Sequence, residues 1–219
     1  MRNHSDHGYD HLACRYQLIE TLIFGSRLKK ARTALLSSIP ACRSALVLGD
    51  GDGRLLEALL TAQPKCQITS VDQSQRMLEI QQQRISNHPR SNNVRWLQQD
   101  ARKLEGFDHQ YDLLVSAFFL DCFTGEELEM NLRKWLNCVR PHGLFYFVDF
   151  QEPGAGWKRV RGKLCLAAMH YFFRRYTNLP NRKLVDLNGA LDQCPLELVT
   201  SENVSHDLIS ARLYRIASK

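Results

Sequence analysis

The sequence lacks any apolar run long enough to cross a bilayer. Its longest apolar stretches, such as 164–169 and 144–148, fall far short of the roughly 20 residues that a membrane-spanning helix needs. The polar, histidine-containing start at residues 1–4 does not resemble a signal peptide. Internal repeats and low-complexity tracts are also absent. We therefore expect a cytoplasmic protein.

Closely spaced cysteines are absent as well. The seven cysteines are an odd number, none belongs to a Cys-x-x-Cys pair, and they stand at positions 14, 42, 66, 122, 138, 165 and 194. This pattern excludes a disulfide or zinc framework and predicts reduced thiols. His4, His7 and His11 share one helical face, but no thiolate or carboxylate framework accompanies them, so we assign no metal.

Positive charge is concentrated in one part of the chain. The formal net charge is +6, and residues 151–183 hold eight Lys or Arg against the single acid Glu152. That segment alone contributes +7, so the rest of the chain is close to neutral. The basicity therefore belongs to the segment and does not describe a fold that is basic throughout.

The chain is long enough for one domain with a substantial core, which we place at 1–219. Hydrophobic residues make up 44% and charged residues 24% of the sequence, as in ordinary globular proteins. Short apolar runs alternate with amphipathic stretches, which is typical of a parallel sheet with crossover helices. We expect strands at 45–49, 67–72, 94–98, 111–117 and 143–150, and helices at 54–62, 75–86 and 126–139.

The two ends of the chain depart from this alternation. Residues 196–204 and 208–217 are strand-like runs with no room for a helix between them, so they must pair antiparallel. Residues 9–36 have the spacing of one or two helices, within an N-terminal helical cover at 1–40. The prediction is a doubly wound α/β fold with a mainly parallel seven-stranded sheet that ends in an antiparallel hairpin.

A glycine-rich turn follows the first expected strand. In 45–54, Ala-Leu-Val-Leu-Gly-Asp-Gly-Asp-Gly-Arg, the glycines at 49, 51 and 53 are spaced two apart and lead into a helix. Glycine removes the Cβ atom where a backbone bends sharply and approaches a ligand. The turn therefore predicts a nucleotide-binding site.

These features together resemble the class I S-adenosylmethionine-dependent methyltransferases over nearly the whole chain. The resemblance rests on Gly49, Gly51 and Gly53, on Asp72 after the second strand, on the pair Asp100 and Ala101 after the third, on 111–115, and on 139–143. It implies that Asp72 binds the ribose hydroxyls of S-adenosylmethionine and that Asp100 and Ala101 hold the adenine amino group. It also implies cofactor contacts for Gln73 and Ser116 and for the glycine turn.

A nicotinamide-dependent oxidoreductase is the nearest competing interpretation. A diphosphate is typically bound by Gly-x-Gly-x-x-Gly, whereas position 54 is Arg. Asp50 and Asp52 would also repel a diphosphate. A sulfonium cofactor tolerates both acids, and we expect Asp50 to contact it.

One residue of the turn departs from the methyltransferase pattern. The family commonly has an acid two residues before the first glycine, and this chain has Val47 there. Asp50 is the substitute that we expect. The departure keeps open a second class of function, a non-catalytic accessory protein that binds the cofactor.

The acceptor should lie beyond the carboxyl ends of the strands, where open α/β sheets bind their ligands. Asp121 and Asp149 are candidate bases or substrate anchors there, and His170, Tyr16 and Tyr9 are candidates from covering segments. Each has a structural alternative, such as capping a turn or burying a ring. Residues 9–16 resemble the helix with which methyltransferases of the quinone-biosynthesis type cover the cofactor.

The segment 151–183 is the expected substrate-covering insertion. Its apolar residues recur at helical spacing, with most of the basic residues off that stripe. Three interpretations stay open: packing on the domain, capping a lipophilic or acidic substrate, and peripheral membrane contact through 157–176. After the fourth strand the sequence has no Asn/Asp-Pro-Pro-Tyr/Phe motif, so a small-molecule acceptor is favoured over nucleic acid. Neither the acceptor nor the oligomeric state follows from the sequence.

Overall fold

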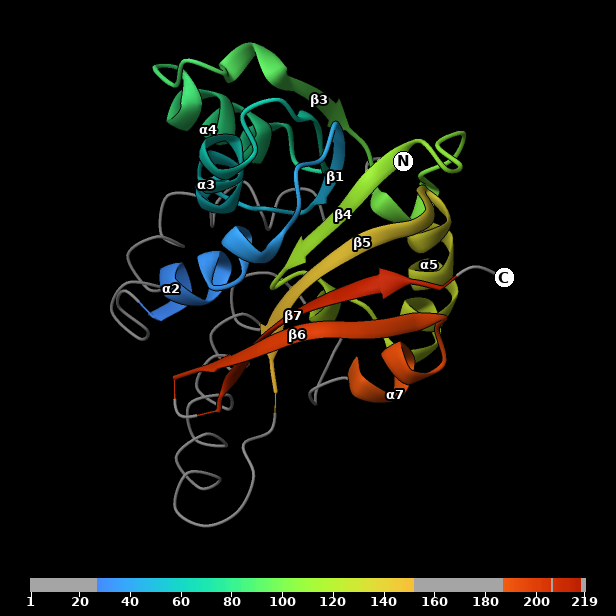
Figure 1. The fold of residues 1–219 in the computed structure, drawn as a ribbon. Coiled ribbons are helices and arrows are strands. Elements are labelled where there is room, and N and C mark those ends of the chain that lie inside the picture. Colours follow the sequence, from blue (N-terminus) through green and yellow to red (C-terminus); the bar gives the residue numbers. More distant parts are fainter. Residues whose placement is uncertain (1–26, 152–186, 206, 218–219) are drawn as a thin grey trace, which may run out of the picture.

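The computed structural model describes residues 27–151, 187–205 and 207–217. In this part of the chain, seven strands form one sheet in the order β3-β2-β1-β4-β5-β7-β6 (Figure 1). The strands are β1 (Ser44–Leu48), β2 (Gln67–Asp72), β3 (Val94–Gln98), β4 (Tyr111–Ala117), β5 (Val139–Phe150), β6 (Leu196–Val204) and β7 (Ile209–Ile216). Strands β1 to β5 run parallel, whereas β7 runs antiparallel to both β5 and β6.

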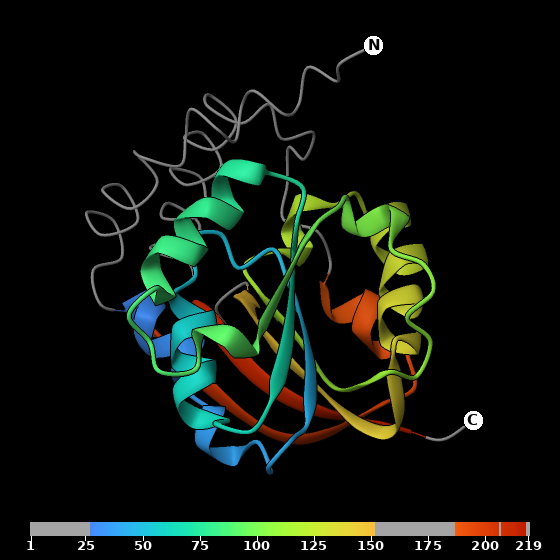
Figure 2. The same cartoon turned by 90° about the horizontal axis from the view of Figure 1, so that it is seen from above.

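Helices cover both faces of the sheet (Figure 2). The helices α2 (Arg27–Thr33), α3 (Arg54–Ala62) and α4 (Gln75–Ile85) lie on one face, and α5 (Gly125–Asn137) and α7 (Leu187–Asp192) lie on the other. Four short 3-10 helices connect the larger elements: η1 (Leu36–Ser38), η2 (Ser91–Asn93), η3 (Ala101–Lys103) and η4 (Leu120–Cys122). The core consequently has two halves, one on each face of the sheet.

Local sequence explains why these elements form. Residues 45–48 of β1 are all buried, and a central parallel strand that is covered on both faces requires such a continuous apolar run. Helix α4 begins after Ser74, whose hydroxyl accepts the Met77 N–H at 3.2 Å. Helix α5 begins with a capping box between Thr124 and Glu127. Both helix starts that matter for the site are therefore encoded locally.

A buried tyrosine attaches α2 to the sheet. The hydroxyl of Tyr146 in β5 lies 3.1 Å from the Arg32 carbonyl oxygen and 3.4 Å from the Leu35 N–H nitrogen. One hydroxyl thus donates to the end of α2 and accepts from the residue before η1. This contact fixes the end of the helix that carries Arg32.

The structure confirms the predicted sheet, in which five parallel strands are followed by an antiparallel hairpin. Strand β5 begins at Val139, four residues earlier than expected, because its first residues pair with β4 before a register shift. Of the expected helices at 9–36, α2 accounts for the described portion. The rest of the helical cover at 1–40 and most of 151–183 lie outside the described residues, so these two boundaries remain predictions.

The five cysteines that the structure describes are free thiols. Cys42 and Cys66 are both buried, with their Sγ atoms 3.2 Å apart. They lie just before β1 and β2, at the amino ends of these strands, whereas the glycine turn lies at the carboxyl end. This thiol pair therefore belongs to the core.

Candidate functional site

The predicted cofactor and acceptor residues gather at one edge of the sheet, where the parallel strands end. The glycine turn follows β1, Asp72 is the last residue of β2, and Asp100 follows β3. Ser116 is the last residue but one of β4, and Asp149 is the last residue but one of β5. Neighbouring parallel strands bring these ends together. This edge is where open α/β sheets bind ligands.

The three glycines of the turn all have positive φ values, of 58°, 62° and 83°, but they serve different purposes. A Cβ at Gly49 would overlap the ring of Phe119. A Cβ at Gly53 would lie 3.1 Å from the Cα of Gln81, whereas one at Gly51 would meet no atom of the described residues within 4 Å. Two of the glycines are thus required by packing within the protein, and Gly51 faces open space that a ligand can fill.

The turn is also held by a buried amide. The Gln81 side chain in α4 donates to the Gly51 carbonyl at 2.9 Å and accepts from the Ser70 hydroxyl at 2.7 Å. Gln81 is fully buried. Helix α4 and strand β2 therefore fix the backbone of Gly51, the one glycine of the turn whose Cβ position is open among the described residues.

Asp50 points toward the start of α3. Its Oδ2 accepts the Leu56 N–H at 2.8 Å, whereas its buried Oδ1 has no hydrogen-bond partner among the described residues. Burial raises the pKa of Asp50 to about 7, although the Leu56 amide and the charge of Arg32 both act to lower it. The carboxyl thus caps a helix and retains one oxygen for a further donor.

Asp52 is paired within the protein. Its Oδ2 lies 2.9 Å from Nε of Arg54 and 2.9 Å from a terminal nitrogen of Arg84, and the residue is 2% exposed. Because two guanidinium groups balance this carboxylate, it would repel a bound diphosphate little. The electrostatic argument against a diphosphate therefore rests on Asp50 alone.

Asp72 is placed by the start of α4. Its Oδ1 accepts the Ser74 N–H at 2.9 Å, and its backbone carbonyl accepts from Gln99 at 3.0 Å. The side chain is partly buried at the end of β2, as is the adjacent Gln73. This geometry holds a carboxylate at the sheet edge, as the resemblance requires.

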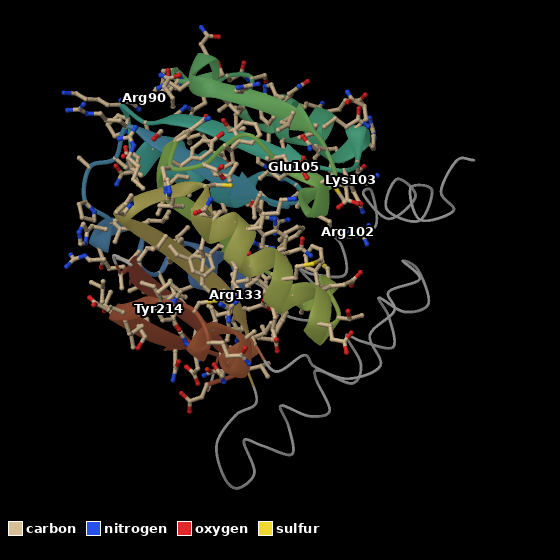
Figure 3. All side chains as sticks on the ribbon, turned by 90° about the vertical axis from the view of Figure 1, so that its right-hand side faces the viewer. Arg90, Arg102, Lys103, Glu105, Arg133 and Tyr214 are labelled. Carbon is tan, nitrogen blue, oxygen red and sulfur yellow. The ribbon has the colours of Figure 1, made fainter. Side chains whose placement is uncertain are left out.

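Asp100 is bound to its neighbour Arg102. The carboxylate accepts the Arg102 backbone N–H at 3.0 Å and its guanidinium at 2.8 Å. Partial burial by itself would raise the pKa of Asp100, but the contacts with Arg102 outweigh it and lower the pKa below its ordinary value. Ala101 is buried, and its carbonyl accepts the indole N–H of Trp135 at 2.9 Å. Figure 3 shows Arg102 close to Lys103 and Glu105 at the edge of the α5 side of the molecule.

Aromatic rings line the segment after β4. Phe118 has a φ of 56°, which is unusual for a residue with a side chain. Its ring centroid lies 5.0 Å from that of Phe150 and 5.0 Å from Cζ of Arg32. The next residue, Phe119, packs against Phe123 and Trp135. Ser116 is buried before them, and its hydroxyl has no partner among the described residues.

Three carboxyl groups lie close enough to the Cys122 thiol to act on it through their charge. Burial raises the pKa of Cys122, and the charges of Asp121, Asp149 and Asp72 raise it further. Asp121 lies in η4 and is partly buried, whereas Asp149 is only 1% exposed. The structure thus brings together both predicted acceptor-side carboxyls and the predicted ribose ligand.

Two residues of this edge were missed from the sequence. Arg32 is 3% exposed, lies over Phe118 and acts on Asp50 through its charge. Phe119 fills the space beside Gly49. The one available signal for Arg32 was its position next to Ala31 in an amphipathic helix. No local pattern predicts the contact of Phe119.

Other expectations fall outside the described residues. These are the candidates His170, Tyr16 and Tyr9, as well as the proposed membrane contact through 157–176. Among the residues that are described, no group of three or more His, Cys, Asp or Glu side chains is arranged to hold a metal ion. In the same residues, no helix combines the length and the hydropathy of a membrane span.

Comparison with known proteins agrees with this geometry. Residues 45–143 match the family model described as a methyltransferase domain. The ubiquinone/menaquinone biosynthesis C-methyltransferase UbiE of Pseudomonas fluorescens is 30% identical over 145 residues, which are 65% of this chain and 56% of that enzyme. The malonyl-[acyl-carrier protein] O-methyltransferase of Halalkalibacterium halodurans is 34% identical over 112 residues, 49% of this chain and 39% of that enzyme. The chain thus matches about half the length of these relatives.

Solved structures show the same fold. The N-methyltransferase NodS from Bradyrhizobium japonicum, in complex with S-adenosylhomocysteine, has a TM-score of 0.70 at 16% identity. This match covers 99% of the present chain and 100% of the NodS chain. The 1,6-didemethyltoxoflavin-N1-methyltransferase of Burkholderia thailandensis has a TM-score of 0.62 at 17% identity. This match covers 100% of the present chain and 93% of that enzyme's chain.

The sheet order and the matching domain define an α/β protein of the Rossmann-like methyltransferase type. More specifically, these matches support a class I S-adenosylmethionine-dependent methyltransferase, and S-adenosylmethionine is the cofactor of that family. These matches remove the support for a nicotinamide-dependent oxidoreductase.

Proposed function

We propose that this chain transfers the methyl group of S-adenosylmethionine to a small-molecule acceptor. The observation that carries the proposal is the open space at Gly51, which lies on the same sheet edge as Asp72 and the carboxyls after β4 and β5. A ligand that enters this space passes between a ribose-binding carboxylate and a group of acceptor-side carboxyls.

The residues present fit this cofactor. Asp72 is the proposed ligand of the ribose hydroxyls, with Gln73 beside it, and Asp100 and Ala101 are the proposed contacts of the adenine. Ser116 has a buried hydroxyl with no partner among the described residues. Such a group is costly unless a ligand or water satisfies it.

The methionine end of the cofactor carries an ammonium and a carboxylate. Asp50 and Arg32 supply a carboxyl and a guanidinium of opposite charge close to the glycine turn. Val47, which stands where the family commonly has an acid, is 1% exposed and packs in the core. We therefore assign the acidic function of the turn to Asp50.

Catalysis in this site is mainly a matter of alignment. The bound cofactor supplies a methyl group on a sulfonium, whose sulfur leaves as a neutral thioether. Positioning of two reactants can remove roughly 7–11 kcal/mol from a barrier. The aromatic side chains of Phe118 and Phe119 line the segment next to the turn, and Asp121 is the carboxylate proposed to receive a proton from the acceptor.

The attacked atom is not fixed by the relatives. The names of the similar proteins include a C-methyltransferase, an O-methyltransferase and N-methyltransferases. We propose a small-molecule acceptor because two of these names, the ubiquinone/menaquinone biosynthesis enzyme and the didemethyltoxoflavin enzyme, refer to small molecules. The segment 151–183 remains the proposed cover of the acceptor, with peripheral membrane contact as an alternative role.

Isothermal titration calorimetry with S-adenosylmethionine and S-adenosylhomocysteine tests the proposal. We expect saturable binding of both, and methyl transfer from labelled S-adenosylmethionine to a member of a small-molecule panel. Absence of binding by either compound would refute the assignment. Tight binding without turnover on any acceptor would instead support the accessory role that Val47 kept open.

A further inference from the structure

Asp149 and Asp121 are neighbouring carboxyls in different surroundings. Asp149 is 1% exposed near the end of β5, where it pairs in register with Ser210 of β7. Asp121 lies in η4 and is partly exposed. The two side chains therefore differ in their access to water, although they lie close enough for the charge of Asp121 to act on Asp149.

The Asp149 carboxyl is built into the backbone that surrounds it. Its Oδ1 accepts the Phe150 N–H at 2.8 Å, and the backbone amides of Leu120 and Asp121 also act on the carboxyl. Its Oδ2 is buried and has no hydrogen-bond partner among the described residues. The carboxyl thus lies close to the backbone of η4 and keeps one oxygen on which a proton can reside.

Among the described residues, we find other charged and titratable groups near Asp149 on η4 and on β7. Cys122 faces it from η4 with a thiol that burial keeps protonated. On the β7 side, the guanidinium of Arg212 donates to Ser210 Oγ at 2.9 Å, to Gln151 Oε1 at 3.0 Å and to Asn188 Oδ1 at 2.7 Å. The cation of Arg212 is thus directed to neutral oxygens.

Two adjacent carboxyls of unequal burial do not ionise together. Burial disfavours the charged form, and a nearby like charge disfavours it further. Burial raises the pKa of Asp149 well above its ordinary value, and the charge of Asp121 raises it more. The proton of such a pair belongs on the buried member, which leaves the exposed member ionised.

We propose that Asp149 holds the proton of this pair and positions η4, so that the negative charge stays on Asp121 at the acceptor end. The inference rests on the proposed function and adds the class of acceptor, one whose nucleophile carries an O–H, N–H or acidic C–H bond. In the reaction, the acceptor forms a bond to the methyl carbon and the carbon–sulfur bond breaks with its electron pair going to sulfur. The acceptor's proton passes to the Asp121 carboxylate. Asp149 is a positioning residue, since it acts through Asp121.

Carbon-13 NMR of the aspartate carboxyls tests this division of charge. The protein is titrated with and without saturating S-adenosylhomocysteine. We expect two carboxyls that titrate well above the ordinary range, those of Asp50 and Asp149, and only the Asp149 signal should be absent from Asp149→Asn. The control Asp108→Asn, at an exposed aspartate, should retain this signal. In Asp121→Asn the pKa of the Asp149 carboxyl should fall, because a repelling charge has been removed.

Two results would overturn the proposal: a wild-type protein in which the carboxyl signal that Asp149→Asn removes titrates in the ordinary range, or an Asp121→Asn variant in which the pKa of Asp149 does not fall. Should Asp149→Asn fail to fold, the Asp121→Asn arm still decides, since Asp121 is partly exposed. Failure of the wild type to bind S-adenosylhomocysteine would refute the proposed function, and the titration without ligand would still decide the charge division.

Discussion

The ring of Phe119 occupies the space that a β-carbon on Gly49 would need. This contact joins the glycine turn after β1 to the segment after β4, and Phe119 in turn packs on Phe123 and Trp135 beneath it. The first glycine of the turn is thus a packing partner of an aromatic cluster.

Substitution of Gly49 by Ala should therefore destabilise the fold. A positive φ costs an alanine roughly 1–2 kcal/mol, and overpacking adds about 1–3 kcal/mol. We expect the free energy of unfolding in urea to fall by about 2–5 kcal/mol. Combined with Phe119→Ala, the loss should be smaller than the sum of the two single losses, because the overlap is gone. Gly125→Ala is the matched control, since its Cβ would meet nothing within 4 Å; strict additivity would contradict the contact.

Gly51→Ala should separate folding from binding. Its φ of 62° carries the same strain of about 1–2 kcal/mol, but no atom of the described residues stands in the way. The added methyl group projects into the proposed cofactor space. We expect S-adenosylhomocysteine to bind at least about tenfold more weakly, or about 1.4 kcal/mol. Unchanged affinity by calorimetry would show that the ligand lies elsewhere.

Asp72→Ala should weaken cofactor binding by about 1.5–3 kcal/mol, the value of hydrogen bonds to a charged group. Because Asp72 also accepts the Ser74 N–H at 2.9 Å, Asp72→Asn is a second variant that keeps an acceptor for this amide. Calorimetry with S-adenosylhomocysteine measures both, and Asp108→Ala serves as the control. A dissociation constant that stays the same in both Asp72 variants would place the ribose elsewhere.

Asp50 should make stability depend on pH. Burial raises its pKa from 3.8 to about 7, so between these values the folded protein binds a proton that the unfolded chain does not. Its contribution is fully present below about pH 4 and is lost as the pH rises to about 7, to a limit of roughly 4 kcal/mol.

Urea unfolding at about pH 5 and about pH 8 measures this dependence. Because Asp149 adds a slope of the same sign, the difference between wild type and Asp50→Asn isolates Asp50. The Asp50→Asn variant keeps an oxygen that accepts the Leu56 N–H. Between about pH 5 and about pH 8, its free energy of unfolding should fall less than that of the wild type. Equal losses would contradict the raised pKa.

Tyr146→Phe should loosen α2. It removes the hydroxyl that lies 3.1 Å from the Arg32 carbonyl oxygen and 3.4 Å from the Leu35 nitrogen, at a cost of about 1–3 kcal/mol for the buried groups left behind. Hydrogen exchange should accelerate at residues 31–36. Tyr111→Phe, which loses a bond to Thr69 on the other face of the sheet, should leave this segment unchanged. Unaltered exchange in Tyr146→Phe would show that α2 is held by its apolar contacts alone.

Much of the fold could be predicted because its signals are local. Helix α3 has the bounds 54–62 that the apolar spacing predicted, and strands β2, β3 and β4 also have the expected bounds. The same alternation predicted which edge would gather Asp72, Asp121 and Asp149, since carboxyl ends of parallel strands lie together.

The internal contacts of the site could not be predicted, because they join distant residues. Gly49 meets Phe119, and Asp52 pairs with Arg84, through packing that no window of neighbouring residues contains. Arg32 is buried because its guanidinium lies over the ring of Phe118 and close to Asp50, and both of these residues belong to other elements of the fold. The sequence thus predicted a ligand contact for Asp50, but it gave no sign that Asp52 would pair with Arg54 and Arg84 inside the protein.

Phe119 packs beside Gly49 and Gln81 packs beside Gly53. These contacts also have a consequence for how the glycine motif is retained in evolution. Substitutions at Gly49 and Gly53 are opposed by the interior of the protein before any ligand can select among them. A descendant that lost its cofactor would still be under pressure to keep both residues. Of the three glycines, Gly51 is therefore the one at which we expect substitutions to accumulate first in a lineage that no longer binds the cofactor.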